Sequence, residues 1–329
     1  MIDVALFGAG RIGNIHAGNI ASLRSQARLK YVVDVNRDAA VELAAKHRAE
    51  VRAVDAALAD ESIGAVVIAS STDTHAELIQ RAAAAGKAIF CEKPVDLDVV
   101  RARTCAHAVA RAGVVCLIGF QRRYDPTFAT LKKRLDAGEI GDAEMLVITS
   151  RDPAAPPIEY IGRSGGIFKD MLIHDFDIVR WIFDDEAVSV HATGSCLTDQ
   201  AIAGAGDIDS TVVTIRTRRQ RLAQINTSRR AAYGYDQRFE VLGSKGMLQA
   251  GNHRPTEVVA HSKSGVTRDT PEPFFLERYR TAYANEMAHF FDAVTNATPV
   301  RTTIQDGVKA LELADAATRS WREKRVVEL

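Results

Sequence analysis

The first 120 residues alternate short apolar runs with segments of helical periodicity. Continuous apolar runs at 2–7, 63–69 and 88–92 are typical of strands that are buried on both faces of a parallel sheet. Further strands are expected at 29–35, near 49–52 and at 114–120, and helices at 14–25, 75–85 and 97–111. Because strand and helix alternate with short connections, this part of the chain predicts a doubly wound parallel α/β sheet.

After Phe120 the pattern changes to an alternation of apolar and polar residues, which predicts a mostly antiparallel open sheet with one exposed face. The alternating segments are 143–152, 187–196, 210–217 and 221–230, and helices are expected at 125–137, 167–183, 278–296 and 303–323. We therefore predict an α/β domain at 1–120 and an α+β domain at 121–329, with no flexible linker between them.

Composition excludes several classes of protein. The 42 basic and 42 acidic residues balance, which argues against a nucleic-acid-binding protein, and the basic run 216–221 reads as the tip of a hairpin between two strands. No apolar run reaches the ~18–20 residues of a membrane span, and no signal-peptide pattern precedes the first strand. The cysteines form no metal-binding spacing, so we expect no metal site and a reduced, cytoplasmic setting. They are Cys91, Cys105, Cys116 and Cys196.

A glycine-rich turn follows the first strand directly. Gly8, Gly10 and Gly13 form GxGxxG between a strand and a helix, where glycines permit the tight turn, the approach of a pyrophosphate and close helix packing. Asp34 ends the second strand, and an acid there hydrogen-bonds a ribose hydroxyl and repels a 2′-phosphate. This context predicts a Rossmann-type NAD site rather than a purely structural turn, although Arg37 lies near enough to soften the preference over NADP.

A second group of polar residues follows the fourth strand. In an open parallel sheet, ligands bind at the carboxyl ends of the strands, so residues 70–75 (SSTDTH) are candidates to border the cofactor. The alternative is that Asp73 or Thr74 caps the next helix and that His75 is a surface residue. The cofactor candidates outside the glycines and Asp34 are Arg11, Ile12, Ser71, Thr72, His75, Glu92 and Lys93.

Lys93 stands in an EKP sequence at the end of the fifth strand. Pro94 biases its backbone away from helical dihedral angles. A cation there can hydrogen-bond a substrate oxygen. A solvated loop lysine is the ordinary alternative, and spacing alone does not decide between them.

Residues 164–177 read SGGIFKDMLIHDFD, in which charged residues interrupt an apolar segment. On one helix, Asp170, His174 and Asp177 would share a face, at i, i+4 and i+7. A structural Asp–His pair and a metal pair without a third ligand are the alternatives. In a chain with a dinucleotide site, histidine is the natural base for the hydroxyl proton of a carbinol that loses hydride. A neighbouring aspartate would orient that histidine and accept a substrate hydroxyl.

Several motifs together resemble one family. They are GAGRIG (8–13), Asp34, AGKAIFCEKP (85–94), GFQRRYDPTF (119–128) and SGGIFKDMLIHDFDIVRW (164–181). The whole chain is similar to the family of glucose–fructose oxidoreductase, inositol dehydrogenase and the rhizopine-catabolism protein (Gfo/Idh/MocA). The segment GGIF-x-DM-x-IHDFD is characteristic of the inositol dehydrogenase branch.

The resemblance implies roles for individual residues. His174 would be the acid/base, Asp170 would bind substrate and orient the site, and Lys93 would hydrogen-bond the reacting oxygen. The expected substrate-binding residues are Lys93, Arg123, Asp170, His174 and either Tyr233 or Tyr235. Family members are usually homo-oligomers, often tetramers, that associate through the open sheet.

The implied reaction is NAD-dependent oxidation of a cyclitol, with myo-inositol oxidised at C2 to the ketone as the first expectation. Alternatives are scyllo- or chiro-inositol, an aldose, or a non-catalytic NAD-binding regulator on the same fold. Two features depart from the family pattern. Lys169 occupies a position that is usually apolar, and the Pro-rich segment 151–162 offers no ligand that can be mapped from the family.

Overall fold

The computed structural model describes residues 1–329, which form two compact units. The first contains Met1–Tyr124 and Ala282–Leu311, and the second contains Asp125–Thr281 and Glu312–Leu329. The chain therefore leaves the first unit after Tyr124 and returns to it at Ala282. Our division of function at residue 120 stays a prediction, because compactness alone does not assign function.

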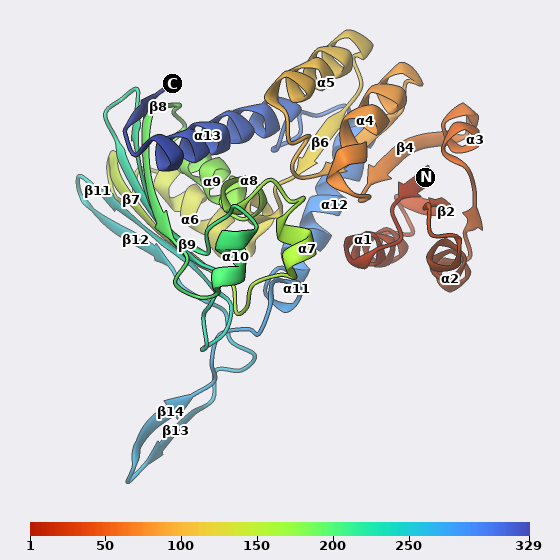
Figure 1. Ribbon diagram of the computed structural model, residues 1–329. Helices are drawn as coiled ribbons and strands as arrows, with labels where there is room; N and C mark the ends of the chain where they lie inside the picture. The colour runs from red at the N-terminus through yellow and green to blue at the C-terminus, as the bar shows by residue number, and fades with distance from the viewer. The chain divides into compact units, whose positions relative to one another are not determined.

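The first unit is built on a six-stranded parallel sheet in the order β3-β2-β1-β4-β5-β6 (Figure 1). Its strands are β1 (Ile2–Phe7), β2 (Ala27–Val33), β3 (Glu50–Val51), β4 (Ile63–Ile68), β5 (Ala88–Glu92) and β6 (Cys116–Gly119). Its helices are α1 (Arg11–Ser22), α2 (Arg37–His47), α3 (Val54–Ala59), η1 (Thr72–Thr74), α4 (His75–Ala84), α5 (Val99–Ala112), η2 (Gln121–Tyr124) and α12 (Arg280–Asn296). Strand order reverses at β1, so the predicted doubly wound sheet is confirmed.

The returning helix α12 completes the core of this unit. Met287, Phe290 and Phe291 are fully buried in the same apolar cluster as the residues of β1, β4 and β5. The ring of Phe290 meets that of Phe90 edge-on, with centroids 5.8 Å apart. Because parallel strands need apolar cover on both faces, α12 is part of what stabilises the sheet.

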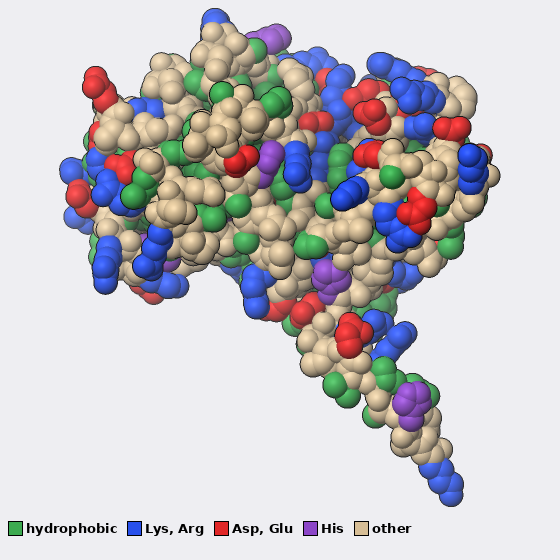
Figure 2. Space-filling view, turned by 180° about the vertical axis from the view of Figure 1, so that it is seen from behind, with side chains coloured by type: hydrophobic (Ala, Val, Ile, Leu, Met, Phe, Trp, Pro, Cys, Tyr) green, Lys and Arg blue, Asp and Glu red, His purple; other side chains and the backbone are tan.

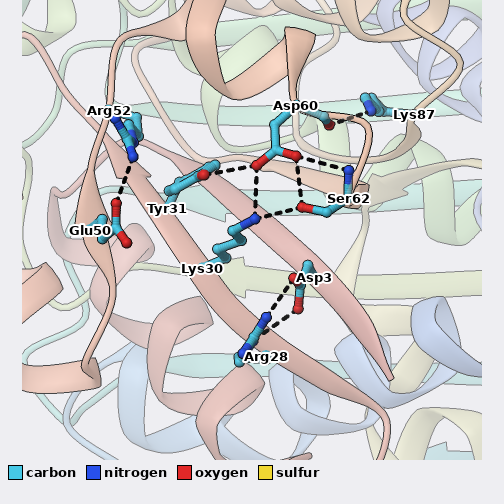
Figure 3. Close-up of polar contacts among 9 residues, drawn as sticks. All are labelled: Asp3, Arg28, Lys30, Tyr31, Glu50, Arg52, Asp60, Ser62 and Lys87. Atoms are coloured by element: carbon cyan, nitrogen blue, oxygen red, sulfur yellow. Dashed lines mark hydrogen bonds and ion pairs between the residues drawn. The ribbon is translucent and has the colours of Figure 1, made fainter.

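Polar contacts join neighbouring strands at the edge of this sheet opposite the glycine turn (Figure 3). Asp60 lies between α3 and β4, and its carboxylate accepts hydrogen bonds from Lys30, Ser62 and Tyr31. These donors lower the pKa of Asp60. Lys30 and Tyr31 thereby connect β2 to the loop before β4, near the end of the sheet where β1 and β4 begin.

The second unit is built on a seven-stranded sheet in the order β12-β11-β7-β10-β9-β8-β15. Only β7 and β10 pair in parallel, so the predicted mostly antiparallel sheet is confirmed. Its strands are β7 (Ala143–Arg151), β8 (Ala187–Ser195), β9 (Ser210–Thr217), β10 (Leu222–Ser228), β11 (Asp236–Gly243), β12 (Gly246–Ala250) and β15 (Val327–Glu328). Its helices are α6 (Pro126–Asp136), α7 (Ile158–Ile161), α8 (Ile167–Asp170), α9 (Ile173–Phe183), α10 (Gln200–Gly204) and α11 (Phe275–Arg278), with the second half of α13 (Ile304–Glu323).

The two faces of this sheet differ. One face packs against helices, as shown by Ser320 of α13, whose hydroxyl accepts a hydrogen bond from the backbone of Ala192. On the other face Met145, Val147 and Leu222 remain exposed. The alternation of apolar and polar residues in the sequence therefore corresponds to one covered and one exposed face of the sheet, as we expected.

One local expectation is wrong, because the helix expected at 167–183 is divided into α8 and α9. The helix expected at 278–296 is confirmed as α12, and the short helix α11 precedes it. The hairpin of β11 and β12 was not predicted. The basic run 216–221 does form the turn between β9 and β10, as expected.

A further hairpin, β13 (Val259–Ser262) and β14 (Gly265–Arg268), projects from the rest of the second unit (Figures 1 and 2). All eight of its strand residues are exposed. Among the helices of the structure, none is both long enough and apolar enough to cross a membrane.

Candidate functional site

The glycine turn has the geometry of a dinucleotide cradle. Gly8 adopts a φ of +108°, and a Cβ there would lie 2.4 Å from the carbonyl oxygen of Ala69. A Cβ on Gly13 would lie 2.0 Å from the carbonyl oxygen of Gly8, whereas a Cβ on Gly10 would meet nothing within 4 Å. Gly8 and Gly13 are therefore required by close packing, while Gly10 leaves open space where a ligand can approach the backbone. The exposed Arg11 and the half-buried Ile12 begin α1 beside this turn.

Asp34 follows β2 and is fixed beside the same turn. Its Oδ2 accepts a hydrogen bond from the backbone of Ala9 at 2.6 Å, and its Oδ1 accepts one from Asn36 at 2.7 Å. Arg37 lies exposed at the start of α2. These residues thus fit a dinucleotide that has a free ribose 2′-hydroxyl. The Asp34 carboxylate can accept a hydrogen bond from that hydroxyl and would repel a 2′-phosphate.

His75 is buried, so the alternative interpretation of His75 as a surface residue is wrong. It is 1% exposed, with Nδ1 2.8 Å from the carbonyl oxygen of Pro94 and Nε2 3.1 Å from that of Ser70. Burial lowers its pKa. Thr74 is the residue before α4 but makes no side-chain cap. His75 therefore joins the segment after β4 to the segment after β5, with Ser71 exposed and Thr72 half-buried.

Lys93 follows β5 directly and is half-buried, and the Lys93–Pro94 peptide bond is cis. The preceding Glu92 is buried, and its Oε1 lies 2.7 Å from Nε2 of His16 on α1. Sequence reasoning missed His16. Its spacing from Gly13, Ala17 and Ile20, which places all four on the buried face of α1, is the signal that could have found it.

Asp170 and His174 do not share one helix, so the argument from helical spacing is wrong. Asp170 is the last residue of α8, and His174 lies in the first turn of α9 after a break at Met171 and Leu172. His174 is 9% exposed and Asp177 is 1% exposed, both within the apolar α9. The break separates the two candidate residues into different elements of the same unit.

Side chains from two other segments of its unit contact Asp170. The hydroxyl of Tyr160 on α7 donates to its Oδ1 at 2.9 Å, and Nη1 of Arg229 lies 3.2 Å from its Oδ2. Partial burial of the phenol and the Asp170 carboxylate raise the pKa of Tyr160, so it stays a donor. Neither partner was predicted, although Tyr160 lies in the Pro-rich segment for which no family ligand could be mapped.

The remaining candidates lie in different surroundings. Nη2 of Arg123 in η2 lies 3.1 Å from Oδ1 of Asp306, within the first unit. The hydroxyl of Tyr233 donates to Asp236 at 2.5 Å and accepts from Arg151. Tyr235 is 5% exposed. A substrate role for Arg123, Tyr233 or Tyr235 stays a prediction.

Lys169, the departure from the family pattern, has a local partner. Its Nζ lies 2.6 Å from Oδ1 of Asp315 on α13. The apolar position is thus replaced by an ion pair between α8 and α13, within the second unit.

Two family models together match nearly the whole chain. The NAD-binding Rossmann fold of an oxidoreductase family matches residues 2–120, and the C-terminal alpha/beta domain of that family matches residues 132–329. The chain belongs to the Gfo/Idh/MocA oxidoreductase family. It is accordingly an NAD-dependent oxidoreductase, and the resemblance inferred from its motifs is confirmed.

Relatives of this family member are similar over their full length. An inositol 2-dehydrogenase of Rhizobium meliloti (strain 1021) is 49% identical over 100% of this chain and 99% of its own. A myo-inositol 2-dehydrogenase of Thermotoga maritima is 43% identical over 99% of this chain and 98% of its own. The crystal structure of a putative myo-inositol dehydrogenase from Sinorhizobium meliloti 1021 covers 100% of this chain and 99% of its own, with a TM-score of 0.97 and 49% identity. The crystal structure of a scyllo-inositol dehydrogenase from Lactobacillus casei with bound NAD(H) and scyllo-inositol has a TM-score of 0.94 and 30% identity, and it covers 100% of this chain and 99% of its own.

Proposed function

We propose that this chain oxidises one ring hydroxyl of a cyclitol to the ketone with NAD⁺, and that its substrate is myo-inositol, oxidised at C2. The observation that carries the proposal is the similarity to inositol dehydrogenases over the full chain, 49% in the Rhizobium enzyme. The chain also retains Lys93, Asp170 and His174. A regulator that only binds NAD has no need of these three residues.

Each unit supplies part of the proposed chemistry. In the first unit Gly8, Gly10 and Asp34 would hold the dinucleotide, and bound NAD⁺ supplies the hydride acceptor. In the second unit the carbinol proton passes to the imidazole of His174, which acts as general base. Oxidation of the carbinol then yields a ketone, NADH and one proton, so atoms and electrons balance.

Lys93 and Asp170 have supporting roles in this proposal. The Lys93 ammonium donates a hydrogen bond to the reacting oxygen and stabilises the negative charge that grows on it. The Asp170 carboxylate accepts a ring hydroxyl, which selects the orientation of a polyol. A substrate with several hydroxyl groups is what such a set of charged side chains recognises.

The first test is NADH formation at 340 nm with purified protein, NAD⁺ and a panel of substrates. The panel contains myo-, scyllo- and D-chiro-inositol, glucose and xylose. Turnover with myo-inositol supports the full proposal, and turnover only with another polyol keeps the mechanism and replaces the substrate. If no compound turns over while NAD⁺ binds, the proposed function is wrong and the regulator is favoured.

We also propose that the chain is a homotetramer that uses the open face of its seven-stranded sheet. Met145, Val147 and Leu222 are 37–48% exposed there, beside a shallow hollow of about 340 Å³. Exposed apolar side chains on a sheet face of this kind are stabilised by a second copy that covers them. We propose a cytoplasmic location, which fits the four cysteines, all free thiols in the structure.

A further inference from the structure

His75 is a buried histidine of the first unit that the proposed chemistry does not use. It is the first residue of α4 and is 1% exposed. Nδ1 lies 2.8 Å from the carbonyl oxygen of Pro94, and Nε2 lies 3.1 Å from the carbonyl oxygen of Ser70. Almost none of its surface is open to solvent, so the two segments that it connects indicate its role.

One of these segments lies against the glycine turn. A Cβ on Gly8 would lie 2.6 Å from the backbone nitrogen of Ser70, so the two backbones are in close contact. The residue before Ser70 is also fixed, because the backbone N–H of Ala69 donates to the carbonyl oxygen of Phe7, the last residue of β1, at 2.7 Å. Ser70 is therefore a fixed point beside the proposed dinucleotide cradle.

The other segment carries Lys93. This lysine lies between Glu92 and Pro94, and each of these neighbours contacts a buried imidazole. Oε1 of Glu92 lies 2.7 Å from Nε2 of His16, and the carbonyl oxygen of Pro94 faces Nδ1 of His75. Because the ring of Pro94 fixes its own φ, a hydrogen bond to its carbonyl oxygen also restrains the peptide that precedes it. The backbone of Lys93 is thus held on both sides.

A single ring proton serves the two carbonyl oxygens that face His75. Burial lowers the pKa of His75, so the ring is neutral at pH 7 and carries one N–H. Both carbonyl oxygens are acceptors, and the ring can donate to only one of them. The shorter distance favours donation from Nδ1 to Pro94, in the segment that carries Lys93.

We propose that His75 is a positioning residue for Lys93, because its Nδ1–H holds the carbonyl oxygen of Pro94 and so fixes the backbone of Lys93 relative to the glycine turn. This inference rests on the proposed function, in which the Lys93 ammonium hydrogen-bonds the reacting oxygen. A lysine stem is flexible, so a fixed backbone limits the positions that its ammonium can reach. A displacement of about 1 Å in such a group can lower a rate about 100-fold.

Two substitutions of His75 separate its two contacts. The amide nitrogen of Asn can take the place of Nδ1, so His75→Asn keeps a donor for Pro94, whereas that of Gln takes the place of Nε2, so His75→Gln loses this donor. We expect kcat/KM for myo-inositol to fall about 3-fold in His75→Asn and about 100-fold in His75→Gln. His107→Gln is the matched control, because that histidine is exposed on α5, and its kcat/KM should be unchanged. The Kd of NAD⁺ should be unchanged in all three variants.

Stability distinguishes positioning from a purely structural role. Asn is smaller than Gln and leaves a cavity, so His75→Asn should be the less stable of the two in urea unfolding. A purely structural role therefore predicts the lower kcat/KM in His75→Asn, and this ranking would overturn the proposal. In a Lys93→Ala background, His75→Gln should lower kcat/KM by less than about 3-fold more. Losses that multiply would also overturn it.

Hydrogen exchange measured by mass spectrometry tests the same contact without turnover. Relative to the amides of β1, those of residues 93–98 should exchange about 10-fold faster in His75→Gln than in the wild type, and His75→Asn should stay close to the wild type. Equal exchange in the wild type and His75→Gln would overturn the proposal. A wild type that binds NAD⁺ but turns over no substrate of the panel refutes the proposed function, while the expected exchange pattern still supports the fixing of the Lys93 backbone by His75.

Discussion

Nε2 of His16 lies 2.7 Å from Oε1 of Glu92, and both residues are buried. His16 belongs to the helix that begins at the glycine turn, and Glu92 is the last residue of β5, directly before Lys93. One buried pair therefore joins the helix at the proposed pyrophosphate site to the strand that carries a proposed catalytic residue. The ring of His16 also packs edge-on against that of Phe90, with centroids 4.7 Å apart.

We expect His16→Ala to lower the free energy of unfolding by about 3 kcal/mol, because it removes one partner of a buried pair and leaves Glu92 without compensation. Urea denaturation followed by circular dichroism measures this change. His107→Ala is the control, since that histidine is exposed on α5. Equal stability of the two variants would mean that the pair contributes nothing to the fold.

Lys93→Ala and His174→Ala should each lower kcat by about 10²–10⁴-fold, the range that a general acid–base or a charge-stabilising group supplies. NAD⁺ binding, followed by quenching of tryptophan fluorescence, should be kept. The exposed Lys46 and His107 give matched alanine controls. Near-normal turnover in both variants would show that these residues are not the catalytic group.

Asp34→Asn should change the choice of cofactor. The amide can still accept the hydrogen bond from Ala9 but lacks the charge that repels a 2′-phosphate, so the ratio of kcat/KM for NADP⁺ to that for NAD⁺ should rise about 10-fold or more. The control is Asp38→Asn, an exposed acid in the first turn of α2. An unchanged ratio in Asp34→Asn would place the selectivity elsewhere.

The protein should lose stability as the pH falls below about 6.5, where histidines of an unfolded chain take up protons. Burial lowers the pKa of His253 and of His289. Nε2 of His253 lies 2.7 Å from the hydroxyl of Thr127, and Nε2 of His289 accepts a hydrogen bond from the backbone of Arg301. The folded state therefore binds fewer protons than the unfolded state in this window, so the histidine contribution is complete above pH 7 and declines towards pH 5. Urea unfolding at pH 8, 6.5 and 5.5 measures the decline, which His253→Gln should reduce. A constant free energy of unfolding would contradict it.

Leu222→Glu should dissociate the proposed tetramer, because a second copy that covers the open face would bury the new carboxylate. Light scattering coupled to gel filtration gives the mass of the particle. Val100→Glu introduces the same charge on α5, at a side chain that is 69% exposed. A wild type that is already monomeric, or a Leu222→Glu protein with unchanged mass, would exclude this face.

The glycine turn could be predicted from the sequence because its requirements are local. A Cβ at Gly8 or Gly13 would collide with backbone atoms, so these positions mark the turn in any chain that forms it. The break between α8 and α9 could not be predicted in this way. No glycine or proline marks Met171 and Leu172, and packing of the neighbouring apolar residues decides where the helix divides.

The burial of Arg229 could have been predicted from the sequence pattern, although we did not predict it. In sequence, Arg229 and Arg230 are two adjacent arginines, yet one is fully buried and the other is exposed. Extending the alternation of β10 from Ala223 and Ile225 by two further steps places residue 229 on the buried face. The position was therefore predictable, whereas its partner Asp170 comes from a distant segment and needed the structure.

Because α12 belongs to the first unit, that unit cannot complete its apolar core until most of the chain has been translated. Met287, Phe290 and Phe291 complete the apolar cluster of β1, β4 and β5, and they leave the ribosome only after residues 125–281. The nascent amino-terminal part therefore emerges with α1 and α2 on this side of its sheet but without α12, and the apolar residues that α12 covers are open to aggregation until the rest of the chain arrives. Translation that stops early would produce a polypeptide that contains every glycine of the turn and still cannot reach its native state.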